Sequence, residues 1–306
     1  MKLPAHEDFA AEFASEAWTD AARAICRRHR LAADRLTRAA QGDNVVFLAD
    51  DRYAIKIYEP IKNAMERERE ALAAARTTIR LPEIVAHGEI EDYEYLVTTQ
   101  IGGRLLTRPE WLALDERDQL SILAQLAEAL RALHATDAAA IAFDWAEFIR
   151  RQAATCYERQ RKCGVNERVL EAIPAFVDEN LPLIDLARPS VFLHGDVHFG
   201  NLRLARENGS WRISGLFDFA DSLKGSHEYD FLAVGVLIIQ GQGALQREFF
   251  RFYGYRDAEI DERMQRRLML LTMFYEWSDL RRYAVRLRPE AVDYPLDRLM
   301  REIWSF

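Results

Sequence analysis

The N-terminal third of the chain combines one helical pattern with a series of strand-like patterns. Apolar residues recur every four positions across residues 10–29, which predicts an amphipathic helix with the stripe Phe9, Phe13, Ala17, Ala21 and Ile25. Five short apolar runs predict strands at residues 34–40, 44–48, 53–58, 84–88 and 95–99. Short turns between the first three runs favour an antiparallel meander. Residues 61–77 show a second helical pattern.

Helical periodicity dominates the rest of the chain. It predicts helices at residues 116–134, 145–162, 166–180, 227–239, 243–253, 257–287 and 291–304. Three short strand-like runs interrupt it at residues 191–193, 201–204 and 211–216. The sequence therefore predicts an α+β protein with two lobes. The smaller lobe, residues 1–101, has a leading helix at about 9–29, a five-stranded antiparallel sheet and one further helix. The larger lobe, residues 102–306, is mainly helical, and ligands tend to bind at such a joint.

Composition excludes several classes of function. The formal net charge of −8 argues against a nucleic-acid partner, since such binding depends on basic patches that release counterions. No apolar run approaches the roughly 18 residues of a membrane helix, and the N-terminus lacks the apolar core of a signal peptide. The three cysteines show no CxxC spacing, so we expect a reduced, cytoplasmic protein.

One motif carries most of the chemical information. Residues 194–201 read His-Gly-Asp-Val-His-Phe-Gly-Asn, and Asp218 follows in a Leu-Phe-Asp-Phe context. An acid, an amide five residues later and a second acid after a strand suit phosphoryl transfer. Asp196 is predicted to accept the proton of the acceptor hydroxyl. Asn201 and Asp218 supply the hard oxygen ligands that Mg²⁺ prefers.

A strand lysine fits the same chemistry. Lys56 alternates onto the face opposite Ile55 and Ile57, where burial is costly unless an anion pairs with the ammonium. The α- and β-phosphates of a nucleotide would be that anion, with a helix glutamate as second partner. Glu68 is the predicted partner because it shares a helix face with Leu72.

Other nucleotide contacts are predicted from position. The turn at residues 41–44 precedes the lysine strand by one hairpin, so backbone N–H groups near Gly42 and Asn44 are expected to approach the phosphates. Gln100 and Ile101 end the last strand of the small lobe, where backbone groups can pair with an adenine edge. His198 is expected near the phosphates or the substrate hydroxyl.

Several residues have two readings. His194, Asp196 and His198 could ligate zinc in a metallohydrolase, but the other histidines are isolated, so His194 is expected to be a buried scaffold residue. Asp230 could accept hydrogen bonds from the catalytic-loop backbone, or it could cap the N-terminus of a helix or compensate its dipole. An aromatic and acidic helical face could bind an amino sugar or simply belong to the core; it comprises Tyr275, Glu276, Trp277 and Asp279.

These residues together resemble the aminoglycoside phosphotransferase family. The family pattern HGDxHxxN is intact at residues 194–201, its later metal-binding aspartate corresponds to Asp218, and its GDxxYD matches residues 225–230 with Ser226 in place of the first aspartate. The resemblance implies a protein-kinase-like bilobal fold, ATP or GTP, Mg²⁺ and a small hydroxylated acceptor. The C-terminal region, with Arg-Phe-Tyr-Gly-Tyr at 251–255, resembles the hygromycin B phosphotransferase branch.

The predicted function is therefore an O-phosphotransferase that moves the γ-phosphate to a hydroxyl of an aminoglycoside or related amino sugar, which implies antibiotic resistance. A choline, homoserine or sugar kinase is the alternative within enzymes. A nucleotide-binding pseudokinase or regulatory module is the alternative outside them. We expect a monomer or homodimer whose partners are a nucleotide and a cationic small molecule.

Overall fold

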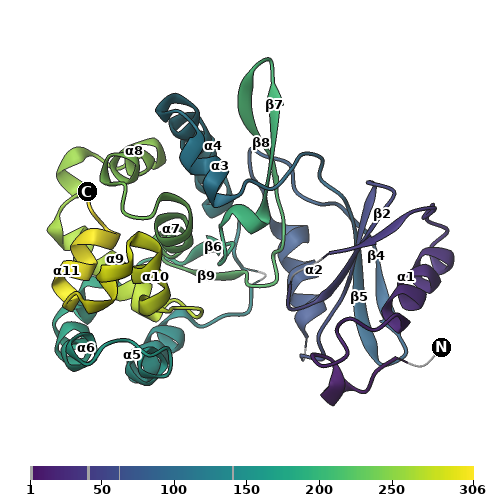
Figure 1. The fold of residues 1–306 in the computed structure, drawn as a ribbon, viewed down its shortest axis with the longest axis horizontal. Coiled ribbons are helices and arrows are strands. Elements are labelled where there is room, and N and C mark those ends of the chain that lie inside the picture. Colours follow the sequence, from purple (N-terminus) through teal and green to yellow (C-terminus); the bar gives the residue numbers. More distant parts are fainter. Residues whose placement is uncertain (1–2, 40–41, 62, 140) are drawn as a thin grey trace.

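The computed structural model describes residues 3–39, 42–61, 63–139 and 141–306. It has a β-rich N-terminal lobe and a larger helical C-terminal lobe (Figure 1), which confirms the predicted α+β, two-lobed fold. The position of the boundary near residue 101 stays a prediction. None of the helices in the described ranges is long and apolar enough to cross a membrane.

The N-terminal lobe contains the predicted five-stranded antiparallel sheet, in the order β1-β2-β3-β5-β4. Its strands are β1 (Leu36–Arg38), β2 (Val45–Ala49), β3 (Tyr53–Ile57), β4 (Ile84–Ile90) and β5 (Tyr93–Thr99). The first three strands form the expected meander. Alternate residues of β2 are buried because one face of the sheet packs under helix α1 (Ala17–Arg28), where Val45, Phe47 and Ile25 share one core.

Helix α1 begins later than the apolar stripe predicts. Phe9 lies before the helix, after a short 3-10 helix at His6–Asp8, and its ring packs 5.4 Å from that of Trp18. The Trp18 indole N–H donates to the Glu12 carbonyl. Two residues nine positions apart are about 13 Å apart along a continuous helix, so this ring contact requires the chain to turn between them.

Helix α2 (Ala64–Ala74) lies between the sheet and the large lobe (Figure 1). It is shorter than the predicted 61–77, and residue 62 of that range lies outside the described residues. Ala71 and Leu72 belong to the core of the large lobe rather than to the core under α1. Helix α2 therefore links the nucleotide-side sheet to the C-terminal lobe.

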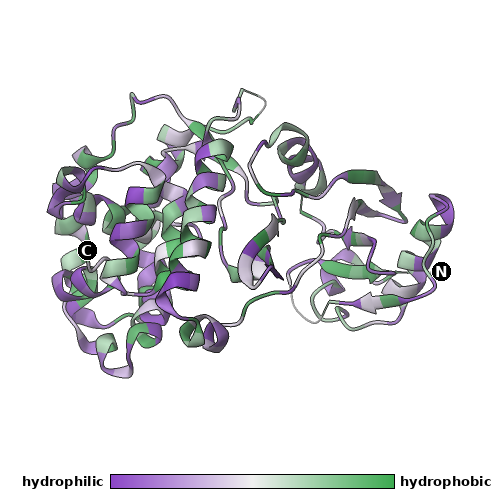
Figure 2. Cartoon of the chain, turned by 90° about the horizontal axis from the view of Figure 1, so that it is seen from above, coloured by the Kyte–Doolittle hydropathy of each residue, from purple (hydrophilic) through white to green (hydrophobic). Residues whose placement is uncertain are grey.

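The C-terminal lobe is built from helices around two small two-stranded sheets, and hydrophobic and hydrophilic residues alternate closely along its helices (Figure 2). Its helices are α3 (Arg108–Ala113), α4 (Glu116–His134), α5 (Trp145–Lys162), α6 (Glu167–Asn180), α7 (Asp230–Ala233), α8 (Gly243–Tyr253), α9 (Glu262–Phe274), α10 (Leu280–Leu287) and α11 (Leu296–Ile303). One sheet pairs β6 (Val191–Leu193) with β9 (Leu223–Gly225), and the other is a hairpin of β7 (Leu202–Glu207) and β8 (Ser210–Leu216). The predicted helices at 116–134, 145–162, 166–180 and 243–253 are confirmed, whereas α3 and β9 were not predicted.

The predicted helix at 227–239 is divided into three types of turn. A 3-10 helix at His227–Tyr229 leads into α7, and a π-helix at Val234–Ile239 follows. The π-helix ends where Gln240 adopts a left-handed conformation with φ 53°. A Cβ at Gly235 would lie 2.2 Å from the ring of Trp304, so only glycine permits this close approach. π-Helical turns such as Val234–Ile239 are frequent at functional sites.

The predicted helix at 257–287 is also broken. Helix α9 ends at Phe274, and α10 begins after Asp279, whose carboxylate accepts the N–H of Arg282 as an N-cap. Buried Gln160 fixes the break, since its amide contacts the Ser278 hydroxyl at 2.9 Å and the Leu280 N–H at 2.9 Å. Residues 275–279 therefore form a loop and not a helical face. The predicted helix at 291–304 is shortened in the same way to α11, after a 3-10 helix at Pro289–Asp293.

Candidate active site

The loop at 194–198 is held by a buried carboxylate. Asp230 accepts hydrogen bonds from the backbone N–H groups of His194, at 2.9 Å, and Gly195, at 2.7 Å. His134 donates to the same carboxylate at 3.0 Å. Asp230 is 1% exposed, so these three donors supply the polar partners that a buried charge needs. The predicted contact of Asp230 with the loop backbone is therefore present, and Asp230 also lies in the first turn of α7, where a negative charge interacts favourably with the helix dipole.

His194 lies fully buried within this loop. Its Nδ1 accepts the backbone N–H of Asp196, so its Nε2–H donates to the Phe217 carbonyl at 3.1 Å. Both ring nitrogens are therefore occupied, which leaves no lone pair for zinc. No group of three or more His, Cys, Asp or Glu side chains in the described ranges is arranged to hold a metal ion. The metallohydrolase reading loses its support.

Asp196 is surrounded by hydrogen-bond donors. Tyr275 donates from its hydroxyl at 2.8 Å, His198 from Nε2 at 3.0 Å and Asn201 from its amide at 3.1 Å. Burial raises the pKa of the Asp196 carboxyl, but the bonds from His198 and Tyr275 outweigh it and hold this pKa below its usual value. Asp196 is therefore a carboxylate at neutral pH.

His198 bonds the carboxylate of Asp196, a contact that the sequence did not predict. Its Nδ1 accepts the N–H of Gly200 at 2.8 Å, so its Nε2 carries the proton that bonds Asp196. The structure brings it to the carboxylate of Asp196 and thus makes it an orienting partner. Its predicted contact with the phosphates or the hydroxyl stays a prediction.

Asn201 and Asp218 lie on neighbouring segments. The N–H of Phe217 donates to the Asn201 carbonyl at 3.0 Å, which joins the two turns of the motif. The Asn201 amide nitrogen is used by Asp196, so its oxygen is the atom suited to a cation. Asp218 is held at φ 67°, and only part of its carboxylate is used by Lys56. An amide oxygen and a carboxylate fit Mg²⁺, which keeps several waters and binds the phosphates directly.

Lys56 connects both lobes through two carboxylates. Its ammonium lies 2.7 Å from Glu68 on α2 and 2.7 Å from Asp218 in the large lobe. Tyr58 donates to the same Glu68 oxygen at 2.5 Å, a contact that the sequence did not predict. Burial lowers the pKa of Lys56, but the charges of Asp218 and Glu68 outweigh it and raise this pKa above its usual value. Lys56 is therefore fully charged. Glu66, on the same helix as Glu68, pairs instead with Arg69 at the surface.

The other residues that were predicted to contact the nucleotide lie in different surroundings, and some of their polar groups already have partners within the protein. Asp43 lines the same cleft as Asp196, which places the turn at Gly42–Asn44 over the cleft, while residue 41 lies outside the described part of the chain. The side chain of Asn44 accepts the N–H of Glu59. The backbone N–H of Gln100 donates to Arg52, so it is not available to an adenine. Ile101 is buried against Gly215.

Only part of the predicted substrate face reaches the cleft. Tyr275 and Trp277 line it, and Trp277 is 58% exposed. Asp279 is instead the N-cap of α10, and the backbone N–H of Glu276 donates to the Tyr229 hydroxyl at 3.2 Å. The prediction of one helical face was wrong because a loop separates α9 and α10.

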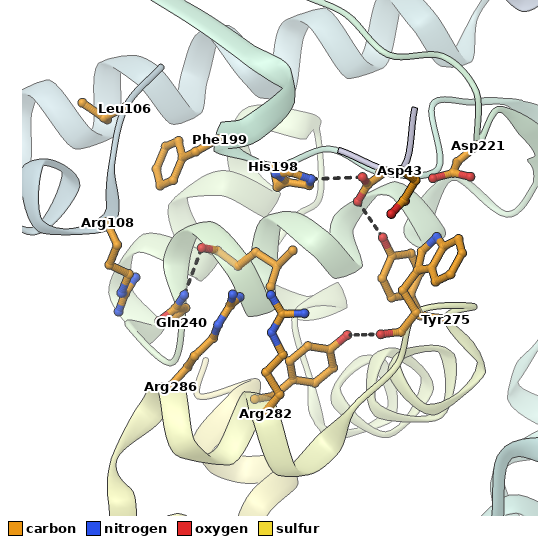
Figure 3. Close-up of a pocket in the computed structure, with 14 residues that line it drawn as sticks. Asp43, Leu106, Arg108, His198, Phe199, Asp221, Gln240, Tyr275, Arg282 and Arg286 are labelled. Carbon is orange, nitrogen blue, oxygen red and sulfur yellow. Dashed lines mark hydrogen bonds and ion pairs between the residues drawn. The ribbon is translucent and has the colours of Figure 1, made fainter. Parts of the chain in front are cut away.

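The cleft has a volume of about 730 Å³ and contains residues that sequence reasoning missed (Figure 3). They are Arg108, Asp221, Gln240, Arg282, Tyr283 and Arg286. Burial and the negative charges of Asp196 and Asp218 raise the pKa of Asp221 to about 6. Asp221 follows Asp218 by three positions, a spacing that could have indicated a shared site. Arg282 and Arg286 are four positions apart and so share a helix face.

A variant with asparagine at Asp230 tests the support of the loop. Its amide would present N–H groups toward the backbone donors of His194 and Gly195. We expect a loss of about 1.5–3 kcal/mol in the free energy of unfolding, measured with urea, together with a loss of activity. Asp257→Asn is the matched control, because Asp257 forms an exposed pair with Arg251 whose loss costs about 0–1 kcal/mol. Equal stability of Asp230→Asn and the wild type would refute this support.

A second buried network predicts a pH effect on stability. His227 bonds the Tyr255 hydroxyl at 2.7 Å, and Tyr255 donates to Glu228, which pairs with Arg267. Burial lowers the pKa of His227 from 6.5 to about 4. Between these values the unfolded chain binds a proton that the folded chain excludes, so stability falls as pH falls, by at most about 1.4 kcal/mol per unit.

Chemical denaturation measures this effect as the change in the free energy of unfolding with pH. The wild type, His227→Gln and His87→Gln are compared between pH 7 and pH 4, a range that spans the two pKa values of His227. The His227→Gln variant should lose this part of the pH dependence. His87 is exposed on β4, so His87→Gln should behave as the wild type does. An unchanged slope in His227→Gln would show that His227 does not titrate in this window.

Comparison with known proteins found a matching family model and similar solved structures. The model of the phosphotransferase enzyme family matches residues 35–268. The GDP complex of wild-type aminoglycoside 2'-phosphotransferase-IIIa is similar in structure, with a TM-score of 0.72 and 14% identity over 94% of this chain and 98% of that one. Aminoglycoside phosphotransferase APH(4)-Ia is also similar in structure, with a TM-score of 0.63 and 16% identity over 93% of this chain and 98% of that one. No curated protein sequence matches the chain.

A third solved structure, the streptomycin–ATP–APH(2")-IIa ternary complex, gives a TM-score of 0.60 and 15% identity over 94% of this chain and 98% of that one. A variant of APH(4)-Ia was solved in a complex with ADP and hygromycin B. Its structure is similar to this chain with a TM-score of 0.62 and 16% identity, over 92% of this chain and 97% of that one. At such identities the likeness shows the shared fold, and the fold does not single out the hygromycin B branch.

Proposed function

The chain belongs to the phosphotransferase enzyme family, and from this premise we propose that it transfers the γ-phosphate of ATP or GTP to a hydroxyl of a small molecule. One observation carries the proposal. Lys56, Glu68 and Asp218 form a charged cluster between the lobes, and Asp196 faces the adjoining cleft with Asn201 bonded to it. This arrangement supports a role for Lys56 in binding phosphates and a role for Asp196 in accepting a hydroxyl proton.

Each residue has a role that its contacts support. Lys56, positioned by Glu68, would neutralise charge on the nucleotide phosphates when Asp218 binds Mg²⁺ instead of the lysine. Asn201 and Asp218 would hold Mg²⁺, which supplies charge neutralisation on the phosphates. Asp196 would accept the hydroxyl hydrogen bond and orient the oxygen toward phosphorus.

The pKa of Asp196 indicates when the proton moves. Three donors hold this carboxylate in its charged form, so it is a weak base toward a free alcohol. In a loose phosphoryl-transfer transition state the hydroxyl becomes acidic only as its bond to phosphorus forms. Asp196 therefore first orients the hydroxyl and receives the proton late.

The identity of the acceptor is a finer proposal. Neighbouring structures were solved with streptomycin, gentamicin, kanamycin and hygromycin B, which makes an aminoglycoside or amino sugar the first candidate. Asp43 and Asp221 beside Asp196 could accept hydrogen bonds from ammonium groups. Choline, homoserine and sugars are the second group of candidates, and a hydroxyl is common to all of them.

A coupled assay of ADP or GDP formation tests the proposal. The enzyme is supplied with Mg²⁺ and each nucleotide, against aminoglycosides including hygromycin B, and against choline, homoserine and sugars. Acceptor-dependent nucleotide turnover is the expected result. Nucleotide binding without turnover for every acceptor would instead favour the regulatory-module alternative.

A further inference from the structure

Three arginines line the cleft away from the Lys56 cluster. Arg108 comes from α3, and Arg282 and Arg286 come from α10. In Figure 3 their side chains lie along one side of the cleft, while His198 and Tyr275 lie along the other. Lys56 and Asp218 are not among the residues that line this cleft. The arginines therefore belong to the acceptor side of the site.

These arginines have no acidic partner within the described ranges of the chain. None of the ion pairs includes Arg108, Arg282 or Arg286, and the one hydrogen bond of their guanidinium groups runs from Arg108 to the Ile238 carbonyl at 3.1 Å. Asp279, the acid next to α10, accepts the backbone N–H of Arg282 instead. Most of the fifteen guanidinium N–H donors of a three-arginine cluster thus remain for a ligand, at roughly five per side chain.

The cluster is electrostatically unfavourable without a ligand. Arg282 and Arg286 are neighbours on one helix face, where like charges destabilise a helix by about 0.2–0.5 kcal/mol. Burial and the charge of Arg282 lower the pKa of Arg286, and they outweigh the opposite effects of Tyr283 and Asp279. Burial and the charge of Arg286 likewise lower the pKa of Arg108. A bound anion would relieve this repulsion.

Gln240 adds an oriented polar group beside the arginines. It follows the π-helix, and its amide nitrogen donates to the Leu237 carbonyl at 3.0 Å. Its Oε1 is buried and has no partner among the described residues, although Gln240 lines the cleft and is only 8% exposed. A buried acceptor of this kind is costly unless a ligand donates to it, and a hydroxyl of the bound molecule can do so, whereas its anionic group would bind the arginines.

From these observations we propose that the acceptor is an anionic molecule, with a carboxylate or phosphate group that binds Arg108, Arg282 and Arg286 while its hydroxyl reaches Asp196. This proposal rests on the phosphotransfer function above and replaces the aminoglycoside with an anionic hydroxylated molecule as the first candidate for the acceptor. A guanidinium group binds carboxylate and phosphate through paired N–H donors. The polycationic aminoglycosides would instead place ammonium groups against three arginines that form no ion pair among the described residues, so they fit this end of the cleft poorly.

Binding of inorganic phosphate tests the proposal without knowledge of the acceptor. Calorimetry is done with Mg²⁺ and a non-hydrolysable ATP analogue at saturation, which fills the nucleotide site. The variant that combines Arg282→Gln and Arg286→Gln should bind phosphate at least about tenfold more weakly than the wild type. Arg281→Gln is the matched control, because Arg281 lies against Gly164 outside this cleft. Equal phosphate affinity in all three proteins would overturn the proposal.

Turnover of matched acceptors gives the second test. The pairs glucose and glucose 6-phosphate, and glycerol and glyceric acid, are assayed beside kanamycin and hygromycin B. The anionic member should have the higher kcat/KM, and the Arg282→Gln/Arg286→Gln variant should lose that preference through KM. Efficient turnover of aminoglycosides that the variant retains would contradict the anionic acceptor but support phosphotransfer. Phosphate binding that depends on the arginines, without turnover of any acceptor, would contradict phosphotransfer alone.

Discussion

Asp196→Asn enzyme is expected to transfer phosphate about 10²–10⁴-fold more slowly than the wild type, with little change in nucleotide affinity. The amide cannot take the hydroxyl proton. It also presents an N–H₂ group to an environment of three donors, from His198, Asn201 and Tyr275. The acceptor oxygen therefore loses both its orientation and its base. The cluster around Lys56 is untouched, so the nucleotide should still bind.

Steady-state kinetics and nucleotide titration of the same preparation separate the two effects. The expected pattern is a loss in kcat with an unchanged Kd for ATP. Tyr275→Phe serves as the graded comparison, because it removes one donor to Asp196 and leaves the carboxylate in place. Transfer by Asp196→Asn at the wild-type rate would remove Asp196 from the reaction.

Lys56→Met is expected to lower kcat/KM for the nucleotide on the order of 10²–10³-fold, the usual effect of one lost charge-stabilising group. Methionine keeps the stem but leaves the Glu68 and Asp218 carboxylates without their common cation. Two uncompensated acids would then face the phosphates. We therefore expect both weaker nucleotide binding and slower transfer.

Nucleotide titration and kinetics with varied ATP measure this change. Lys162→Met is the control, since Lys162 lies at the end of α5 and is exposed. Glu68→Ala compared with Glu66→Ala tests the partner: Glu68 is 4% exposed beside Lys56, whereas Glu66 pairs at the surface with Arg69. Equal effects of the two glutamate variants would show that the Lys56–Glu68 contact does not position the lysine.

Local features of the sequence predicted the core of the site. The motif at 194–201 is contiguous, so its residues had to lie in one loop. The choice of Glu68 needed only helical spacing and the burial of one face, and the structure contains its contact with Lys56. The five strands were equally local, because each is a short apolar run between turns.

Long-range packing decided the features that were missed. The break after Phe274 depends on Gln160 of α5, which lies far away in the sequence. The π-helix that carries Gln240 to the cleft depends on the contact between Gly235 and Trp304. Arg108 and Arg286 meet only because α3 and α10 border the same cleft. In the sequence each arginine is indistinguishable from a solvated surface residue.

The most direct test is phosphorus-31 NMR of a reaction mixture that contains the wild-type enzyme, ATP, Mg²⁺ and an acceptor found active in the coupled assay. The predicted result is a new phosphomonoester resonance, coupled to the proton on the carbon that bears the oxygen, which appears as the γ-phosphate signal of ATP disappears. The resonance should be absent with Asp196→Asn. Release of inorganic phosphate alone, with no phosphomonoester, would contradict transfer to a hydroxyl.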